Sequence, residues 1–196
     1  MGVGRAGGGP GDARRRPWRG TPVAGAAAAE RQWRHHLTAP VPTGASPTGY
    51  GVRALGGGLE LLERCYASGL AFHDGDVRVA VDNRSDPGWY RTIQRAPLYR
   101  RDLDLIAVTD DGAVAGFVTA WFGDVTLSAY LEPVGVVPAH RRRGLGRALL
   151  TEALARVQRL GATLALAGGY DERANALYGS LMTDGADVSE AWQRIW

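Results

Sequence analysis

Residues 136–147 combine the residue types that a phosphate-binding site requires. An apolar stretch ends at Pro138, an arginine run follows, and Gly144 and Gly146 open a long amphipathic segment. The first backbone N–H groups of a helix have no partner inside the helix, and the helix dipole adds partial positive charge there. Glycine lets a bulky anion approach that backbone, and arginine side chains supply formal charge. The pattern therefore predicts a strand, a loop and a helix start that hold phosphate oxygens.

Two other phosphate-binding motifs do not fit this stretch. A P-loop needs a Gly-Lys-Ser/Thr sequence, and the chain has no lysine, because all 23 of its Lys/Arg residues are arginine. A dinucleotide-binding fingerprint needs a third glycine at the position of Leu149. From these residues alone, the alternative is a solvated basic loop in front of a surface helix.

The composition fits a protein with one domain of ordinary size. The 196 residues are 45% hydrophobic, and no apolar run approaches the roughly 20 residues that span a membrane. The single cysteine, Cys65, has no partner for a disulfide or a zinc site, which favours a reducing, cytoplasmic location. Residues 1–49 carry a net charge of +5, from seven arginines against Asp12 and Glu30, so the remainder carries −2. This balance argues against nucleic-acid binding by residues 50–196.

Residues 1–49 differ in composition from the rest of the chain. They are rich in Gly, Ala, Pro and Arg and contain few large aliphatic side chains, so they cannot bury enough apolar surface to offset the entropy of ordering. We therefore predict a disordered tail over residues 1–49 and one domain over residues 50–196. The alternatives for the tail are an export signal, a remnant of a preceding domain at residues 31–36, or a misplaced start.

The periodicity of residues 50–196 predicts alternating strands and helices. Strands are expected at 51–55, 103–109, 114–122, 127–137, 163–167 and 187–196, and helices at 59–72, 89–96, 144–160 and 173–181. Several antiparallel strands followed by a strand–helix–strand–helix order indicate an α+β domain, with a mixed, mostly antiparallel sheet flanked by helices.

The stretch from Val134 to Leu149 closely resembles the acetyl-CoA-binding motif of the GNAT (GCN5-related) N-acetyltransferase superfamily. That motif has an apolar-x-Val-x-Pro strand, then Arg/Gln-x-x-Gly-x-Gly/Ala at a helix start, and both halves occur here at the right separation. The resemblance covers about residues 50–196, and the order of elements agrees with it. Leu103-Asp104-Leu105 and Glu132-Pro133-Val134-Gly135 further resemble actinobacterial-type members.

The resemblance implies acetyl-CoA as co-substrate, without a metal, and assigns its contacts. The backbone of Val134, Gly135 and Val136 would pair with the pantetheine arm as a pseudo-strand. The pyrophosphate would be held by the loop and the helix start, comprising Arg141, Arg142, Arg143, Gly144, Leu145, Gly146 and Arg147. Asn175 is a further candidate contact for the pantetheine, although an ordinary exposed helical asparagine is the alternative.

Pro133 supports the same interpretation on independent grounds. A proline inside a central strand removes a hydrogen bond of the ladder, so we expect it at a bulge or where strand pairing ends. GNAT proteins typically bulge this strand and splay it from the next one. The resulting wedge admits the thioester.

Two residues are candidates for catalysis. Tyr178 ends Ala174-Asn-Ala-Leu-Tyr178, which resembles the family's Ala-x-x-Leu-Tyr helix, and it is the candidate acid that protonates the leaving thiolate. Its alternative role is core packing. Glu132 is the candidate base for the attacking amine, and a half-exposed structural glutamate is the alternative. The chain departs from the family pattern at Asp171 and at Met182-Thr183.

We therefore expect an N-acetyltransferase that moves an acetyl group to a primary amine in a ternary complex, and a small-molecule acceptor. A non-catalytic acyl-CoA-binding or sensing module of the same fold is the alternative. A homodimer is compatible with both. Tyr130 could line the acceptor pocket, with Trp89 and Tyr90 at its border, and the cluster of His73, Asp74 and Asp76 is expected to be solvated rather than metal-binding.

Overall fold

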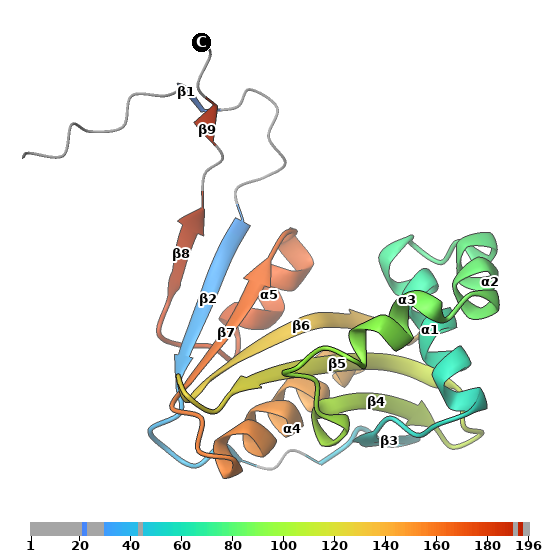
Figure 1. Cartoon of the computed structure of the whole chain (residues 1–196), viewed down its shortest axis with the longest axis horizontal. Helices are drawn as coiled ribbons and strands as arrows, with labels where there is room; N and C mark the ends of the chain where they lie inside the picture. Colours follow the sequence, from blue (N-terminus) through green and yellow to red (C-terminus); the bar gives the residue numbers. More distant parts are fainter. Residues whose placement is uncertain (1–20, 23–29, 43–44, 190–191, 194–196) are drawn as a thin grey trace, which may run out of the picture.

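The computed structural model describes residues 21–22, 30–42, 45–189 and 192–193 of the chain. Within them, a seven-stranded sheet has the strand order β3-β4-β5-β6-β7-β2-β8, in which all neighbours are antiparallel except β6 and β7 (Figure 1). The strands are β2 Glu30–His36, β3 Tyr50–Ala54, β4 Asp104–Thr109, β5 Val114–Gly123, β6 Ser128–Val136, β7 Leu164–Gly169 and β8 Ala186–Ser189. The predicted α+β class with a mixed, mostly antiparallel sheet is confirmed.

Helices flank this sheet, and two short strands pair outside it. The α-helices are α1 Leu59–Phe72, α2 Val77–Ser85, α3 Gly88–Ile93, α4 Leu145–Arg159 and α5 Glu172–Gly179. Short 3-10 helices span Arg101–Leu103 and Pro138–His140, and β1 (Thr21–Pro22) pairs with β9 (Trp192–Gln193). None of the helices in the described part of the chain is long and apolar enough to cross a membrane.

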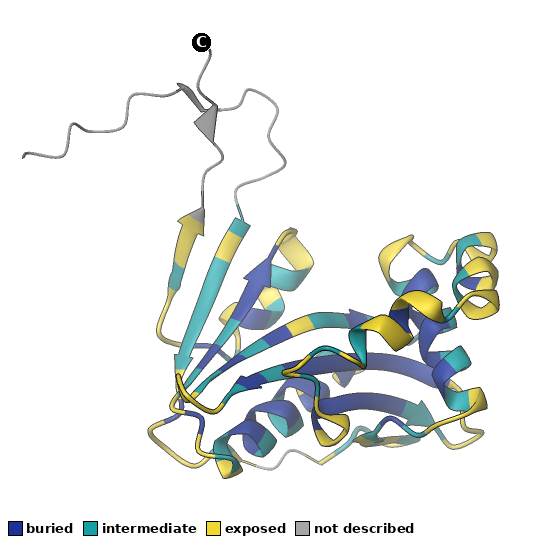
Figure 2. Cartoon of the chain, viewed as in Figure 1, coloured by how far each residue is buried: buried dark blue, intermediate teal, exposed yellow. Residues whose placement is uncertain are grey.

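The core lies on both faces of the central strands, because successive side chains of a strand point to opposite faces. On one face, Leu105 and Val118 join the cluster under α4. On the other face, Ile106 and Phe117 pack with Cys65 of α1, and all five side chains are buried. Buried residues follow β4 and β5, whereas β2 and β8 are half-buried or exposed (Figure 2).

Strand β2 places part of the expected tail inside the sheet. It pairs antiparallel with β7 over Arg31–His36 and with β8 over Glu30–Trp33. The following segment is held to α4, since Gln158 donates to the Leu37 carbonyl at 3.0 Å. The domain therefore begins before residue 50, in contrast to the predicted boundary. The predicted disorder of residues 1–20 and 23–29 lies outside the described residues.

Helix α2 was not expected from the sequence. Its N-cap is Asp76, whose carboxylate accepts hydrogen bonds from the backbone N–H groups of Arg78 and Val79. It packs closely on α1 because Gly69 has no side chain; a β-carbon there would lie 2.5 Å from the Cα of Ala80. Across the described residues, no group of three or more His, Cys, Asp or Glu side chains is placed to hold a metal ion.

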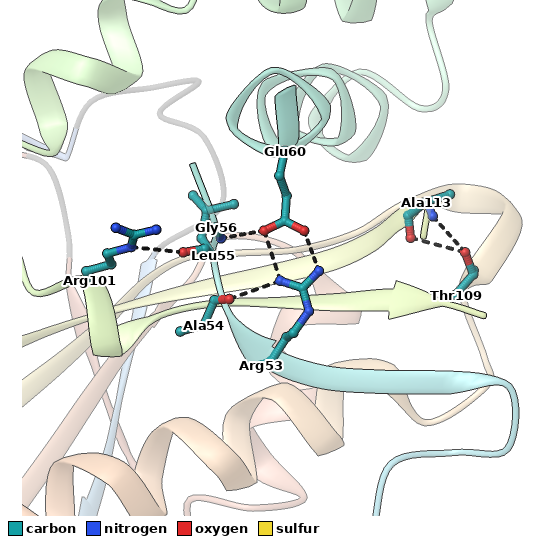
Figure 3. Close-up of polar contacts among 8 residues, drawn as sticks. All are labelled: Arg53, Ala54, Leu55, Gly56, Glu60, Arg101, Thr109 and Ala113. Carbon is teal, nitrogen blue, oxygen red and sulfur yellow. Dashed lines mark hydrogen bonds and ion pairs between the residues drawn. The ribbon is translucent and has the colours of Figure 1, made fainter. Parts of the chain in front are cut away.

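The start of α1 is tied to β3 through Glu60 (Figure 3). Its carboxylate accepts hydrogen bonds from the Arg53 guanidinium and the Gly56 backbone N–H, and Arg53 also donates to the Ala54 carbonyl at 3.2 Å. The Arg53 hydrogen bond is the main cause that lowers the pKa of Glu60. The contact anchors the first turn of α1 to the end of β3.

Candidate active site

Strands β6 and β7 diverge in the middle of the sheet. They pair in parallel only between Ser128–Tyr130 and Leu164–Leu166, although β6 continues to Val136 and β7 to Gly169 (Figure 1). Within the described part of the chain, the edge of β6 that faces away from β5 therefore lacks a partner strand beyond Tyr130. This is the geometry that a ligand needs to pair with the backbone of β6.

A β-bulge lies at the mouth of this opening. Val118 pairs with Val134 and Ala120 with Leu131, so Glu132 and Pro133 together oppose one residue of β5. The predicted bulge at Pro133 is confirmed. Trp121 holds it by donating its indole N–H to the Glu132 carbonyl at 2.6 Å. The Glu132 side chain is exposed at the opening.

The loop after β6 prepares the start of α4. Gly144 is the N-cap residue with φ of 83°, a left-handed conformation that favours glycine, and no side chain caps the first turn. The N–H groups of this turn are therefore available for an anion. The Leu145 side chain is buried in the core, so only its backbone can contact a ligand.

The arginines of this loop are mostly engaged within the protein. Arg141 donates to the carbonyls of Val136 at 3.1 Å and Ala71 at 2.9 Å, and its guanidinium lies 3.3 Å from the Asp74 carboxylate. It therefore ties the loop to the end of α1. A direct side-chain contact between Arg141 and a pyrophosphate would require these bonds to break.

The neighbouring arginines also reach across to other elements. Arg143 donates to the Tyr50 hydroxyl at 3.0 Å, and Arg147 donates to the Ser180 hydroxyl at 3.1 Å. Arg142 is exposed and makes no side-chain hydrogen bond or ion pair to another described residue. Of this run, Arg142 is the side chain most readily available to a bound anion.

Gly146 has a packing role that the sequence did not reveal. A β-carbon at this position would lie 2.9 Å from Cδ2 of Leu177, which belongs to α5. The glycine therefore allows α4 and α5 to pack closely. Its expected role in phosphate binding can come only from its backbone.

The two candidate catalytic side chains belong to one electrostatic cluster. Tyr178 is 5% exposed, and burial is the largest cause that raises the pKa of its hydroxyl, followed by the negative charge of Glu132. Tyr130, Asp171 and Tyr170 raise the Tyr178 pKa further. The tyrosine is therefore fully protonated at neutral pH, which is the form that can donate a proton.

The end of β7 is a second part of this cluster, and two of its members were not predicted from the sequence. A β-carbon on Gly168 would lie 2.7 Å from Oε1 of Glu30, 2.9 Å from the Tyr130 hydroxyl and 3.3 Å from the Tyr170 ring. Glu30 was assigned to the tail and Tyr170 to a loop. The Gly168-Gly169 pair at a strand end was the available signal, since such glycines mark close approach.

On the opposite face, Trp33 of β2 holds α5. Its indole N–H donates to Oδ1 of Asn175 at 2.8 Å. A β-carbon on Gly179 would lie only 2.7 Å from the Trp33 ring, so the glycine allows this close contact. Asn175, a candidate contact for the pantetheine, therefore already has its Oδ1 hydrogen-bonded within the protein. Asp171, which departs from the family pattern, is the N-cap of α5 and accepts from the Ala174 backbone N–H at 2.7 Å.

Tyr90 belongs to the core rather than to the border of the acceptor site. It is fully buried and donates its hydroxyl to Asp104 at 2.7 Å, as Tyr99 does. The buried Arg64 guanidinium lies 4.7 Å from the Tyr90 ring centroid and 3.5 Å from that of Phe117. Tyr90 thus lies between a buried cation and a buried anion.

Comparison with known proteins agrees with this geometry. Residues 61–182 match the acetyltransferase (GNAT) family. A GCN5-related N-acetyltransferase from Sphaerobacter thermophilus has a similar structure, with a TM-score of 0.62, 20% sequence identity and coverage of 84% of this chain and 50% of that one. A tandem GNAT protein from the clavulanic acid biosynthesis pathway has a TM-score of 0.58 and 18% sequence identity. The match covers 85% of this chain and 52% of that one.

An aminoglycoside acetyltransferase from an uncultured soil metagenomic sample gives a TM-score of 0.54 and 25% identity, and the match covers 68% of this chain and 91% of that one. The chain spans about half the length of the first two solved structures. No curated protein sequence matches it significantly. Because the family match covers more than half of the chain, this protein belongs to the GNAT acetyltransferase family.

Proposed function

We propose that the protein transfers an acetyl group from acetyl-CoA to a primary amine of a small molecule. The family supports acetyl transfer, and the separation of β6 from β7 beside Glu132 is the observation that carries the proposal. It leaves a strand edge open next to an exposed carboxylate and a buried, protonated tyrosine. A sensing module would need the open edge but not the two titratable groups.

The described residues fit acetyl-CoA. The edge of Val134, Gly135 and Val136 that has no partner strand can pair with the amide groups of the pantetheine, as a strand would. The Val136 carbonyl already accepts from Arg141, so this pairing uses the other backbone groups of the edge. The uncapped first turn of α4, entered through Gly144, can hold the pyrophosphate with backbone N–H groups and the helix dipole. Arg142 is exposed to solvent and adds a positive charge beside the pyrophosphate. Arg141, Arg143 and Arg147 instead stabilise the loop and the helix start through hydrogen bonds to other elements.

When bound, acetyl-CoA supplies a thioester whose acetyl carbon is transferred as a C–N bond forms and the C–S bond breaks. Glu132, exposed at the bulge, accepts the proton that the amine loses, directly or through water. Tyr178 donates its hydroxyl proton to the departing thiolate. The raised pKa of Tyr178 keeps this proton in place until it is needed.

The acetyl-CoA site is tested by Gly144→Glu. The substitution places a carboxylate at the proposed pyrophosphate site, so calorimetry should show no acetyl-CoA binding. Gly112→Glu is the matched control, because Gly112 has a similar φ of 87° and open space around it, far from the site in sequence. Retained binding in Gly144→Glu, with both variants folded, would contradict the assignment.

The reaction is tested by a screen of amines that follows release of the CoA thiol together with acetylated product by mass spectrometry. Aminoglycosides, alkyl diamines and amino acids cover the small-molecule classes, and a peptide with a free N-terminus covers the protein class. The solved aminoglycoside acetyltransferase with a similar fold supports starting with the first class. Tight acetyl-CoA binding without turnover on any amine would instead favour the sensing module.

A further inference from the structure

We infer that the acceptor carries a second positive charge, and that Glu30 of β2 recognises it. This inference rests on the proposed function and adds the substrate class. The start of β2 lies beside the end of β7 (Figure 1). Carboxylate and tyrosine side chains come together at this point.

The first observation is that Gly168 leaves a space that three polar or aromatic groups fill. Oε1 of Glu30, the hydroxyl of Tyr130 and the ring of Tyr170 all come within 3.3 Å of the point where a β-carbon would stand. They come from β2, β6 and the segment after β7. Any larger residue than glycine would force them apart.

The second observation is the charge of this cluster. Burial raises the pKa of Tyr170 to about 12, and the next causes are the charge of Glu132 and a hydrogen bond to Glu30. Both carboxylates, one from β6 and one from β2, therefore act on the same hydroxyl. Asp171, close enough to Tyr178 to raise its pKa, adds a third negative charge.

Nearby arginines do not neutralise these carboxylates in the described residues. Arg34, on the same face of β2, lies 3.3 Å from Asp187 of β8. Arg173 of α5 lies 3.6 Å from Asp74, at the end of α1. Neither of these two arginines is therefore paired with Glu30 or Glu132, and carboxylates left without a paired arginine attract cationic ligands.

Aromatic rings add a second attraction for an ammonium group. Tyr130 and Tyr170 lie close to the Glu30 carboxylate, and Tyr170 is 57% exposed. An ammonium over such rings gains cation–π energy in addition to the ion pair. One amine of the acceptor would react beside Glu132, while a second ammonium would lie between Glu30 and Tyr170.

The test compares three acceptors of equal length that differ only at the far end. Putrescine carries an ammonium there, aminobutanol a neutral hydroxyl and aminobutyrate a carboxylate. We expect kcat/KM to fall about tenfold or more from putrescine to aminobutanol, beyond the statistical advantage of two identical amines, and further for aminobutyrate. Higher salt should reduce the difference in kcat/KM between putrescine and aminobutanol.

Glu30→Gln should abolish the preference for putrescine over aminobutanol, because it lowers kcat/KM for putrescine much more than kcat/KM for aminobutanol. Glu30→Lys should move the preference toward aminobutyrate. Asp82→Asn, which removes one exposed negative charge from α2, is the control and should retain the wild-type order. A uniform loss of activity on all three acceptors in Glu30→Gln would show a structural role and overturn the inference.

A binding measurement separates this inference from the proposed function. Calorimetry of putrescine and aminobutanol with the wild-type protein and Glu30→Gln, in the presence of CoA, needs no turnover. Tighter binding of putrescine that depends on Glu30 supports the inference even if no acceptor is acetylated. Equal binding of both ligands to both proteins overturns it, even if the enzyme acetylates other amines.

Discussion

The hydrogen bond between Trp33 and Asn175 gives a quantitative test of the role of β2. Trp33→Phe keeps an aromatic ring but removes the indole N–H, which donates to Asn175 Oδ1 at 2.8 Å in a partly buried position. The substitution therefore breaks the side-chain link between β2 and α5. The smaller phenyl ring also loses part of the contact that the indole ring makes with Gly179.

The size of the effect follows from the contact. A hydrogen bond of this kind contributes about 0.5–1.5 kcal/mol, and an acceptor left unpaired adds about 1–3 kcal/mol when fully buried. Because Asn175 is only partly buried, we expect Trp33→Phe to lower the free energy of unfolding by about 2 kcal/mol. Asn175→Ala should lower the free energy of unfolding by a similar amount, because it removes the same hydrogen bond.

Urea unfolding of both single variants and the double variant measures the coupling. If the bond acts as described, the double variant loses less than the sum of the single variants, by about 1 kcal/mol, with an unchanged m-value. Trp89→Phe, at a 38% exposed tryptophan of α3, is the control and should stay within about 0.5 kcal/mol. Additive losses, or no loss in Trp33→Phe, would refute the reasoning.

Three other predictions concern stability. A chain starting at Tyr50 lacks β2 and should lose cooperative urea unfolding, because β7 and β8 lose the strand between them; a cooperative transition would contradict this. Asp104→Ala should lower the free energy of unfolding, measured with urea, by about 3–5 kcal/mol, because it removes the buried acceptor of Tyr90 and Tyr99. A loss under about 1 kcal/mol would be inconsistent with that role. Burial raises the pKa of Tyr90 and Tyr178, so above about pH 10 the unfolded chain binds fewer protons than the folded one. The free energy of unfolding should then fall by about 1.4 kcal/mol per pH unit for each tyrosine, and a free energy of unfolding that stays constant above about pH 10 would argue against this.

The sequence predicted the elements whose pattern is local. The helix at residues 145–159 has a strong apolar periodicity, and the Pro133 bulge follows from the missing N–H of proline. These features do not depend on which other segments pack against them. The strand–loop–helix at the proposed coenzyme site was predictable for the same reason.

The elements that depend on distant partners were missed. Strand β2 is polar, with the sequence Glu-Arg-Gln-Trp-Arg-His-His, and it is stable because both of its edges are paired. Helix α2 has weak apolar character, and Asp76 was its only local signal. The role of Gly146 could not be predicted either, because Leu177 reaches it from another helix.

Tyr178→Phe is the most direct test of acetyl transfer with Tyr178 as the acid. The measurement is the rate of CoA thiol release in the presence of an accepted amine, together with the Kd of acetyl-CoA for the wild-type protein and the variant. We expect kcat to fall by about 10²-fold or more with an unchanged Kd, because only the hydroxyl is removed. Equal kcat values, or acetyl-CoA binding without amine-dependent thiol release in the wild-type protein, would contradict it.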